Sequence, residues 1–511
     1  MEKVKDFLKK HQTKLLFVIE FIASFFVALL FLKIFTAKHY GGFWSLKHLL
    51  ILIPFAIIFV ASFIRNIFLN KETIEKLWMI FLIPVGMFFL VYIIPTFAPD
   101  EQAHLWKSYE ISTGTVITKL NKDGSYPTTI PKFYEESVIP NISNYNDMFD
   151  KSRIHTNYKD TTTVTNPASG YFSPLYLFSS IGLLAGRILG MNGIYAEYLA
   201  RLCNYVVFLI LGYYSMKKIP FGKLAVGVLL FFPMCLQQGT SMSIDCLIIG
   251  LSIFYVAYTF YLRYKEEAFT KKEKIIYCIT SVLIAVAKYV YLPICCLSLL
   301  LIGTKKFNKK QIAILILGTI IIPLLIAGIW FKVSSRYEDK RSYIYENNIN
   351  FGEQLHFVIQ QPVHFAKIIL NDAVKSSEPY LYGAIGANLG WLNINVPHLK
   401  ITILLFLLIL SVYFEDNSQE MKRVEWIYTL IITLGVYFLT IVALYLIWSS
   451  VGSEVVSGVQ GRYFVPILIL PALCLARKNN YVKIKNIAFI LLIILTAIDL
   501  SVVKVIFDFF V

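Results

Sequence analysis

Two adjacent carboxylates, Asp100 and Glu101, directly follow an apolar run from Met79 to Phe97 that is long enough to cross a bilayer. Ionisable side chains at a membrane boundary are energetically costly, so they are first interpreted as functional. A carboxylate beside a water-filled cleft can act as a general base on a hydroxyl group. We therefore expect Asp100 to be the catalytic base, with Glu101 as the second candidate, and we expect His104 to bind substrate.

Four further charged side chains fall at the same depth in the expected topology, although they come from distant parts of the chain. They are Arg201, Asp245, Lys288 and Arg462. Each also has a structural interpretation, as a helix cap, a snorkelling side chain or a headgroup anchor. Arginine binds a phosphate through two parallel hydrogen bonds and lysine acts as a point charge, so the three cations suit a phosphate or diphosphate group. Asp245 would then orient the acceptor, or share a metal ion if one is bound.

A phosphate headgroup fixed at the bilayer edge, with its tail in lipid, describes a polyprenyl-phosphate-linked sugar donor. Phosphate leaves the anomeric carbon readily once its charge is neutralised, so this chemistry needs no strong acid. The paired acids can also hold a divalent cation, Mg²⁺ or Mn²⁺, through oxygen ligands, but nothing in the sequence requires one. The sequence contains no Walker loop, no His-Glu-x-x-His and no Gly-x-Ser-x-Gly. We therefore assign no metal ligands.

The composition of the 511-residue chain is typical of an α-helical membrane protein. Hydrophobic residues make up 57% of it, charged residues only 16%, and the mean hydropathy is +0.64. A soluble domain would carry about a quarter charged residues. The seven cysteines lie in or beside apolar runs and lack metal-ligand spacing. We predict an all-α polytopic integral membrane protein embedded in the lipid bilayer.

Apolar runs and basic loops together predict about thirteen transmembrane helices. Their expected ranges are Leu15 to Phe35, Leu49 to Ile67, Leu77 to Phe97, Tyr198 to Met216, Gly222 to Leu236, Ser243 to Leu262, Ile275 to Lys288, Tyr291 to Ile302, Ile312 to Phe331, Ile401 to Phe414, Trp426 to Trp448, Tyr463 to Leu475 and Ile487 to Phe507. The Lys-rich start predicts a signal anchor, with the N-terminus in the cytoplasm and the active site on the outer face of the cytoplasmic membrane.

One apolar segment, Phe172 to Leu189, allows two interpretations. If it spans the membrane, Lys217 and Lys218 lie outside, against the positive-inside rule. If it lies along or dips into the outer face, every later short inner loop carries Lys or Arg. We choose the interfacial or re-entrant interpretation. This topology explains the net charge of +16 without a nucleic-acid partner.

The expected topology divides the chain into four parts. Residues 1–76 form an N-terminal two-helix membrane segment, and residues 77–333 form a catalytic membrane module. The first outer loop of that module, about residues 98–197, carries the acidic motif and the interfacial helix. Residues 334–400 form a second large outer loop, and residues 401–511 form the C-terminal membrane helices with a Gln-Gly-Arg-Tyr motif.

The polar motifs of the chain resemble those of the bacterial family catalogued as domain of unknown function 2142. Asn393 stands where an Asp is expected, so that position is assigned no acid role. The matching segments are Pro99-Asp100-Glu101-Gln102-Ala103-His104 with Tyr109 and Gly114, Ser173-Pro174-Leu175-Tyr176, Gln238 to Asp245, Lys288-Tyr289-Val290-Tyr291-Leu292-Pro293, Gly390-Trp391-Leu392 with Pro397, and Gln460-Gly461-Arg462-Tyr463-Phe464-Val465-Pro466.

That family is similar to the GT-C glycosyltransferase superfamily, and the resemblance implies a GT-C-like fold. It also implies a lipid-linked sugar donor, an outer-face active site, inverting transfer and an interfacial helix after the first loop. Its first motif implies a base at Asp100 or Glu101. Seven residues are expected to bind substrate: His104, Arg201, Asp245, Lys288, Tyr291, Arg462 and Tyr463.

We therefore predict a glycosyltransferase that uses a polyprenyl-phosphate sugar and a cell-surface polysaccharide or lipid-linked glycan as acceptor. A transporter or flippase of lipid-linked glycans is one alternative, and it would place charges at helix midpoints and break helices in repeated halves. A polysaccharide polymerase or ligase, which consumes a diphosphate-linked oligosaccharide, is another. A non-catalytic assembly protein would tolerate the loss of any single outer polar residue.

Overall fold

The computed structural model describes residues 2–36, 73–122, 124–138, 141–302, 308–337, 342–415, 417, 419–478 and 486–511. The expected second membrane helix, Leu49 to Ile67, lies outside these residues. The described chain is mainly helical, as predicted, but it also contains two small antiparallel sheets of two strands each. These sheets lie in the two long segments that were expected to be loops.

Seven helices of the described chain are long and apolar enough to cross a membrane, which supports a multi-pass membrane protein. One of these spans, Lys309–Ser334, consists of two α-helices joined without a break by a π-helical turn, η6 (Leu317–Ile321). The seven lie within α1 (Glu2–Thr36), α3 (Ile74–Tyr92), α8 (Gly193–Lys218), α11 (Asp245–Tyr264), α14 (Lys309–Ile316) with η6 and α15 (Ile322–Ser334), α21 (Arg423–Trp448) and α23 (Ile487–Phe510).

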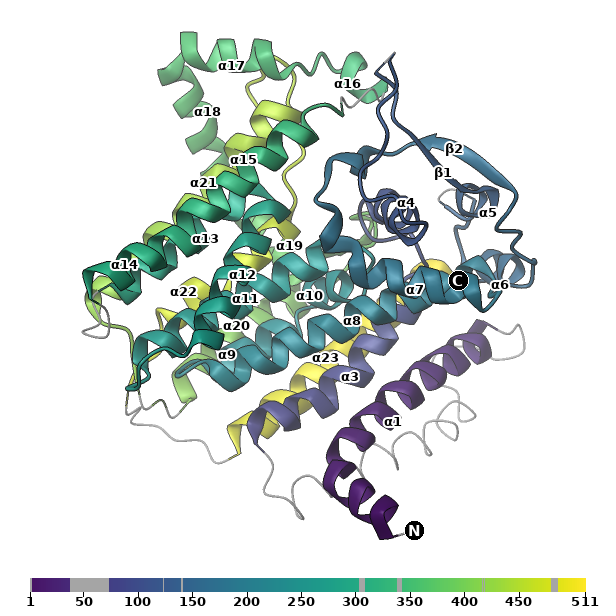
Figure 1. Ribbon diagram of the computed structural model, residues 1–511, viewed down its shortest axis with the longest axis horizontal. Helices are drawn as coiled ribbons and strands as arrows, with labels where there is room; N and C mark the ends of the chain where they lie inside the picture. Colours follow the sequence, from purple (N-terminus) through teal and green to yellow (C-terminus); the bar gives the residue numbers. More distant parts are fainter. Residues whose placement is uncertain are drawn as a thin grey trace.

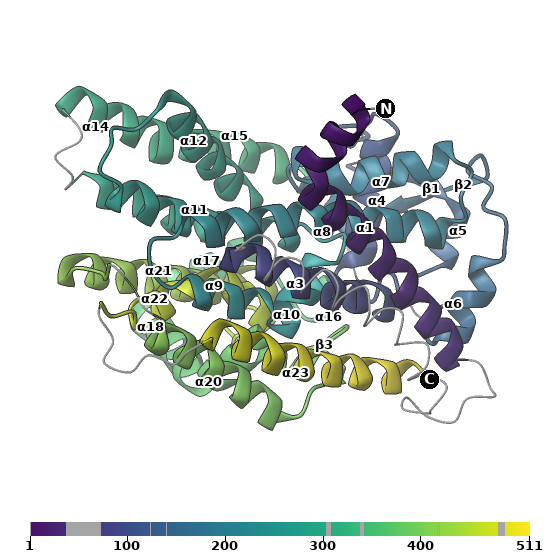
Figure 2. The same ribbon diagram turned by 90° about the horizontal axis from the view of Figure 1, so that it is seen from below.

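Helix α3 is the central element of the bundle, because 83% of its span is buried inside the protein. It packs against α1, α8 and α23. Helix α23 runs alongside it in both ribbon views, whereas α1 crosses it at an angle in the second (Figures 1 and 2). The indole of Trp78 is fully buried near its start. A rigid, buried helix of this kind fixes the position of the chain that follows it, which is the segment carrying Asp100.

The expectation of about thirteen spans is not confirmed, because several expected spans are shorter or broken in the structure. The run Gly222 to Leu236 forms two helices, broken before Pro233, whose ring nitrogen cannot donate a helical hydrogen bond. The run Tyr463 to Leu475 is likewise divided. The short elements are α9 (Lys223–Leu230), α10 (Pro233–Gly239), α12 (Lys271–Ala287), η4 (Tyr289–Tyr291), α13 (Leu292–Cys295), η5 (Cys296–Leu301), α20 (His398–Phe414), η7 (Gly461–Ile467) and α22 (Ile469–Leu473).

The first long segment after α3 folds over one end of the bundle, which we call the pocket face. Its helix α7 has 12 residues and therefore rises only about 18 Å, too little to cross hydrocarbon. This length agrees with the interfacial interpretation of Phe172 to Leu189. The elements are α4 (Glu101–Ser112), β1 (Pro127–Pro131), α5 (Lys132–Glu136), α6 (Tyr145–Ser152), β2 (Thr161–Thr165), η2 (Pro167–Gly170), η3 (Ser173–Tyr176) and α7 (Leu177–Ile188), with Pro127 opposite Thr165 in the sheet.

The second long segment also lies at the pocket face and ends in a tight hairpin. Its short strands, β3 (Asn388–Leu389) and β4 (Ile394–Asn395), pair in antiparallel register, and Gly390 and Leu392 between them have positive φ. The hairpin therefore holds Trp391 at its tip. The preceding helices are α16 (Ser342–Glu346), α17 (Phe351–Gln360), α18 (Pro362–Lys375) and α19 (Ser377–Ile385).

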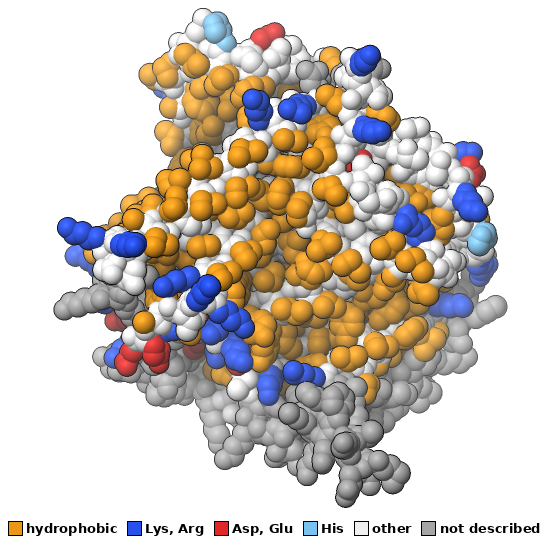
Figure 3. Space-filling view, in the orientation of Figure 1, with side chains coloured by type: hydrophobic (Ala, Val, Ile, Leu, Met, Phe, Trp, Pro, Cys, Tyr) orange, Lys and Arg blue, Asp and Glu red, His pale blue; other side chains and the backbone are white. Residues whose placement is uncertain are grey.

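The opposite end of the bundle, the basic face, carries short loops rich in Lys and Arg. Two ion pairs connect helices at this face: Lys223 of α9 pairs with Glu75 of α3, and Arg263 of α11 pairs with Glu425 of α21. Figure 3 shows Lys and Arg side chains gathered along the lower-left edge of the view, near α9 and α14, below a broad hydrophobic surface. Its cations include Lys217, Lys218, Lys223, Arg263, Lys271, Lys272, Lys422, Arg423 and Arg477.

Candidate functional site

Asp100 lies in the turn that joins α3 to α4, with a backbone φ of 62°. It occupies the N-cap position of α4, yet its side chain does not cap the helix. Instead the carboxylate forms an ion pair with Arg462, and 48% of the side chain is exposed. Burial alone would raise the pKa of Asp100, but the charge of Arg462 and its hydrogen bond outweigh this effect and lower the pKa. Asp100 is therefore an ionised carboxylate that ligands can reach.

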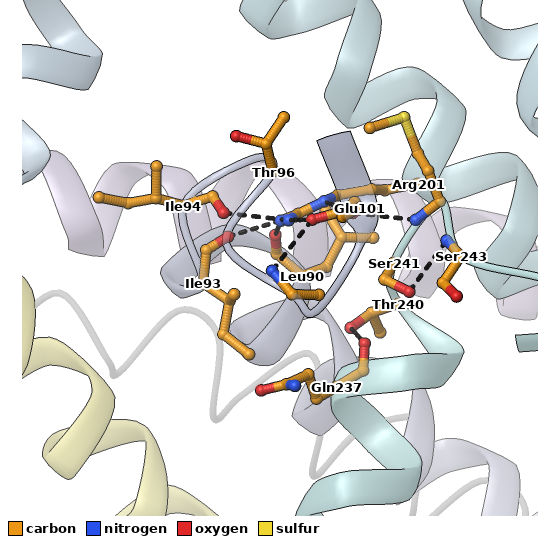
Figure 4. Close-up of polar contacts among 12 residues, drawn as sticks. Leu90, Ile93, Ile94, Thr96, Glu101, Arg201, Gln237, Thr240, Ser241 and Ser243 are labelled. Carbon is orange, nitrogen blue, oxygen red and sulfur yellow. Dashed lines mark hydrogen bonds and ion pairs between the residues drawn. The ribbon is translucent and has the colours of Figure 1, made fainter. Parts of the chain in front are cut away.

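Glu101, one residue later, is fully buried and faces the interior of the bundle. It binds Arg201 of α8 through two parallel hydrogen bonds, of 2.8 Å from Nε and 2.5 Å from Nη2. The backbone N–H of Met242 donates a further hydrogen bond of 2.9 Å to its Oε1. Figure 4 shows this arrangement beneath the turn that follows α3. The carboxylate of Glu101 thus joins α4, α8 and the chain before α11.

The guanidinium of Arg201 is equally occupied by protein groups. Besides Glu101, it donates hydrogen bonds to the backbone oxygens of Leu90, Ile93 and Ile94, where α3 ends and leaves carbonyls without helical partners (Figure 4). Only 1% of its side chain is exposed. The structure therefore gives Arg201 the position of a helix C-cap, rather than the expected headgroup anchor, and leaves it no route to a ligand.

Arg462 links the two remaining acids of the site. It forms ion pairs with Asp100 and with Oδ2 of Asp245, the latter over 3.2 Å, and donates to the backbone oxygen of Pro99 over 3.0 Å. Lys288 binds Oδ1 of Asp245 over 2.5 Å. Two carboxylates and two cations thus form a charge-balanced cluster, which we call the Asp100 cluster: Asp100, Asp245, Lys288 and Arg462.

Two tyrosines fix the cations of the Asp100 cluster. The ring centroid of Tyr463 lies 4.8 Å from the Lys288 ammonium and 5.0 Å from the Arg462 guanidinium, distances typical of cation–π contacts. The hydroxyl of Tyr291 donates a 2.8 Å hydrogen bond to the backbone oxygen of Tyr463. The sequence motif that begins at Lys288 and the motif that contains Arg462 are therefore in direct contact.

His104 lies on α4 beside the cluster, where a 2.7 Å hydrogen bond joins its Nδ1 to the hydroxyl of Tyr176. Burial lowers the pKa of His104 to about 4, against the attraction of Asp100 and Asp245. The imidazole is therefore neutral near pH 7, and it can donate or accept a hydrogen bond without carrying charge.

Protonation of His104 should make the protein less stable in acid. The unfolded imidazole binds a proton near pH 6.5, the folded one only near pH 4, so stability falls as the pH drops between these values. We expect a loss of about 3 kcal/mol of unfolding free energy across this window. The thermal unfolding midpoint in detergent, measured from pH 7 to pH 4, should depend less on pH in His104→Gln than in the parent protein. Equal dependence in the two proteins would contradict the assignment.

A cavity of about 870 Å³ opens beside the Asp100 cluster. Its polar end is lined by Asp100, His104, Lys288 and Arg462, and its apolar walls include the ends of α15 and α21. Trp330 and Phe331 belong to the first wall, and Leu444, Ile447 and Trp448 to the second. Both wall helices belong to the candidate membrane spans. The cavity therefore has a charged end, at the Asp100 cluster, and apolar walls from helices of the candidate membrane spans.

The chain matches a family model described as a predicted membrane protein, DUF2142, over residues 82–471. The chain belongs to the DUF2142 family. This confirms the resemblance found in the sequence, and the matched region contains all the predicted site residues. No curated protein and no solved structure matched the chain.

The predicted site residues of this DUF2142 protein fall into two groups in space. Glu101 and Arg201 form a buried pair beneath the turn and do not line the cavity, and Asp245 lies behind Lys288 and Arg462 and bridges them. The residues that line the cavity are Asp100, His104, Lys288, Tyr291, Arg462 and Tyr463.

Most aromatic residues of this cavity were not predicted from the sequence, and two of them, Trp391 and Tyr171, contact the turn after α3 or His104. Trp391 is 43% exposed at the tip of the β3–β4 hairpin, and its indole N–H donates a 3.2 Å hydrogen bond to the backbone oxygen of Thr96. Tyr171 packs on His104 with ring centroids 5.6 Å apart. The Gly390-Trp391-Leu392 motif was the available signal for this hairpin. The motif was interpreted only through the acid expected after it, where the chain has Asn393.

The residues present do not fit a divalent metal ion. The described residues contain no group of three His, Cys, Asp or Glu side chains placed to hold one. Of the acids that were considered as oxygen ligands, Glu101 is paired with Arg201, and Asp100 and Asp245 are both paired with Arg462. We derive no step through a metal ion.

Proposed function

We propose that this protein is an integral membrane glycosyltransferase of the GT-C type. It takes a sugar from a polyprenyl phosphate and transfers it, with inversion, to a cell-surface polysaccharide or lipid-linked glycan. The observation that carries the proposal is the cavity, which combines a charged end with apolar walls from two membrane-spanning elements. A soluble sugar nucleotide has no apolar chain to pack against such walls, whereas the chain of a polyprenyl phosphate would lie along them.

The charge balance of the Asp100 cluster suggests how the donor activates the base. Arg462 is paired with Asp100, so a phosphate group that binds Arg462 must compete with that carboxylate. Binding of the donor would loosen the Asp100–Arg462 pair and raise the pKa of Asp100 from its lowered value. The carboxylate then becomes a stronger base at the moment when the acceptor needs one.

The proposed reaction is a single displacement at the anomeric carbon of the sugar. The acceptor oxygen forms the new C–O bond, while the bond from the anomeric carbon to the phosphate oxygen breaks and the phosphate retains the electron pair. The acceptor proton passes to the carboxylate of Asp100. Lys288 and Arg462 stabilise the charge that develops on the leaving phosphate. Neutral His104 hydrogen-bonds the sugar or the acceptor.

The basic face supports the proposed orientation in the cytoplasmic membrane. Its Lys and Arg residues lie on loops at the end of the bundle opposite the Asp100 cluster. Cytoplasmic loops carry an excess of such residues, so this end belongs in the cytoplasm and the pocket face outside. A labelling reagent that cannot cross the membrane should reach the pocket face of intact cells and leave the basic face unmodified.

The direct test is transfer by the purified protein in liposomes. A radiolabelled polyprenyl-phosphate sugar is supplied with a glycan extract from the producing cell, and the polyprenyl phosphate released is identified. The proposal requires labelled glycan and free polyprenyl monophosphate in equal amounts. A parallel reaction supplies a polyprenyl-diphosphate-linked oligosaccharide instead, and release of polyprenyl diphosphate from that donor would identify a polymerase or ligase. The glycan composition of a strain without the protein would name the sugar.

A transporter or flippase remains the second candidate, because two apolar runs that were expected to span the membrane are broken. The pairs α9–α10 and η7–α22 are each interrupted near a proline, and transporters bind substrates at discontinuous helices of this kind. The same liposomes distinguish the two functions. Movement of labelled lipid between leaflets without any transfer of sugar would favour transport.

Removal of the Lys288 charge should weaken donor binding. We expect Lys288→Gln to raise the KM for the polyprenyl-phosphate sugar about 30-fold, because a charge-assisted hydrogen bond to phosphate contributes about 2 kcal/mol. The kcat should change less than the KM. Lys332→Gln, an exposed lysine in the last turn of α15, is the matched control and should leave both constants unchanged. An unchanged KM in Lys288→Gln would contradict the phosphate assignment.

A further inference from the structure

Helices α17 and α18 form a hairpin of residues 351–375 that stands apart from the membrane bundle at the pocket face (Figure 1). The helices α17 and α18 were expected within a large outer loop, and such loops are ordinarily polar. On α17, however, the large exposed residues are Phe351, Leu355 and Ile359. A spacing of four residues places these three side chains in one strip along the helix.

Helix α18 repeats this pattern on its exposed side. Val363, Leu370 and Val374 form its strip and are 56% to 74% exposed, whereas the opposite side, with Ile368 and Ile369, packs against the protein. Two neighbouring helices thus each present an apolar strip that no described residue covers. Water contact with six large apolar side chains in one small lobe is unfavourable, so the strips indicate a further partner.

The position of α18 along α21 shows the level at which the hairpin lies. The hydroxyl of Tyr437 donates a 2.8 Å hydrogen bond to the backbone oxygen of Ala373, near the end of α18. Tyr437 lies just past the middle of α21, a candidate span of 26 residues that starts at the basic face. With a rise of 1.5 Å per residue, about 16 Å of α21 extends beyond Tyr437 to the pocket face. The end of α18 therefore reaches down to membrane level.

The apolar strips continue the surface that faces lipid. Leu434 and Leu439 of α21 and Ile329 of α15 are exposed on membrane-spanning elements. In the space-filling view, hydrophobic side chains cover both this part of the bundle and the lobe above it (Figure 3). The exposed Lys367 lies beside the α18 strip, and a lysine at a bilayer interface extends its ammonium toward the headgroups.

We propose that the α17–α18 hairpin is a membrane-docking element, with its two apolar strips immersed in the lipid leaflet at the pocket face. The partner is the bilayer itself, and the polar side of α17, with Glu353, His356 and Gln360, faces water. Phe351, at the start of α17, also lines the cavity. The hairpin thus brings lipid to the rim of the cavity. This inference depends on the fold alone and not on the proposed function.

Photocrosslinking to lipid tests the proposal. A benzophenone amino acid replaces Ile359 or Val374 in the full-length protein, which is reconstituted in vesicles of phosphatidylethanolamine and phosphatidylglycerol and irradiated. Leu434 is the lipid-facing reference and Gln360, next to Ile359 on the polar side, is the matched control. Mass spectrometry should find lipid adducts at Ile359 and Val374 within about two-fold of Leu434, and at least about five-fold above Gln360.

Two outcomes would overturn the proposal. Adducts at Ile359 and Val374 that are as rare as those at Gln360 would place the strips in water. Crosslinks from these positions to a second copy of the chain, seen as a dimer band on a denaturing gel, would make the hairpin an oligomer contact instead. A thermal unfolding midpoint unchanged from the parent protein confirms that each substituted chain is folded before irradiation.

Discussion

Asp100→Asn should abolish sugar transfer while the protein remains folded and inserted in the membrane. The substitution removes the proton acceptor but keeps the size of the side chain, and general base catalysis contributes about a thousand-fold to the rate. Asparagine also tolerates the left-handed backbone that Asp100 adopts, so the turn is preserved. Arg462 retains Asp245 and the backbone oxygen of Pro99 as partners. The rate of product formation from a labelled polyprenyl-phosphate sugar is the measurement.

The matched control for this variant is Asp150→Asn. Asp150 lies in the same long segment at the pocket face, and its side chain is 75% exposed and far more accessible than that of Asp100. Asp150→Asn should keep the parent thermal unfolding midpoint, because an exposed ion pair contributes only about 1 kcal/mol or less. Asp100→Asn should stay close to that midpoint, because Arg462 keeps its other partners, Asp245 and the backbone oxygen of Pro99. Full activity of Asp100→Asn would remove Asp100 from the mechanism and leave the site without an accessible base.

The acid limb of the pH profile depends on the same carboxylate. Because Arg462 lowers the pKa of Asp100 in the free protein, kcat/KM should be lost only as the pH falls below the ordinary range for aspartate. In the donor complex the Arg462 pair is loosened, so the acid limb of kcat should lie at higher pH than that of kcat/KM.

The sequence located the site but could not divide roles between its two adjacent acids. Polarity at the end of an apolar run marks Asp100 and Glu101 equally. Their difference arises because α4 begins between them, and successive residues at a helix start point in directions about 100° apart. One carboxylate therefore faces the cavity and the other faces Arg201 inside the bundle. Only the orientation of α4 against α8, a tertiary property, determines which is which.

The expected number of spans is not confirmed, for a local reason that the sequence does contain. Apolar composition was counted across Pro233 and Pro466, although proline ends or distorts a helix. Trp391 could not be found in the same way. It reaches the cavity only because a two-residue strand pair and the positive φ of Leu392 fold the hairpin toward the turn after α3. Such contacts between residues far apart in the chain leave no periodic signal.

Glu101→Gln should destabilise the fold, although it changes the residue next to Asp100. A glutamine keeps one acceptor oxygen but places an NH₂ group against either Arg201 or the backbone N–H of Met242, all of which are donors. The buried guanidinium then lacks its counter-ion, and loss of one partner of a buried pair costs about 3–5 kcal/mol. We expect a lower yield of monodisperse protein and a lower thermal unfolding midpoint than in Asp100→Asn.

Arg201→Met tests the same pair from its other side. This substitution leaves Glu101 charged and also removes the donors to the backbone oxygens of Leu90, Ile93 and Ile94, so it should be at least as destabilising as Glu101→Gln. The two adjacent acids would then have opposite phenotypes, one losing turnover and the other stability. A Glu101→Gln protein that unfolds at the parent midpoint but transfers no sugar would reverse this division and make Glu101 the base.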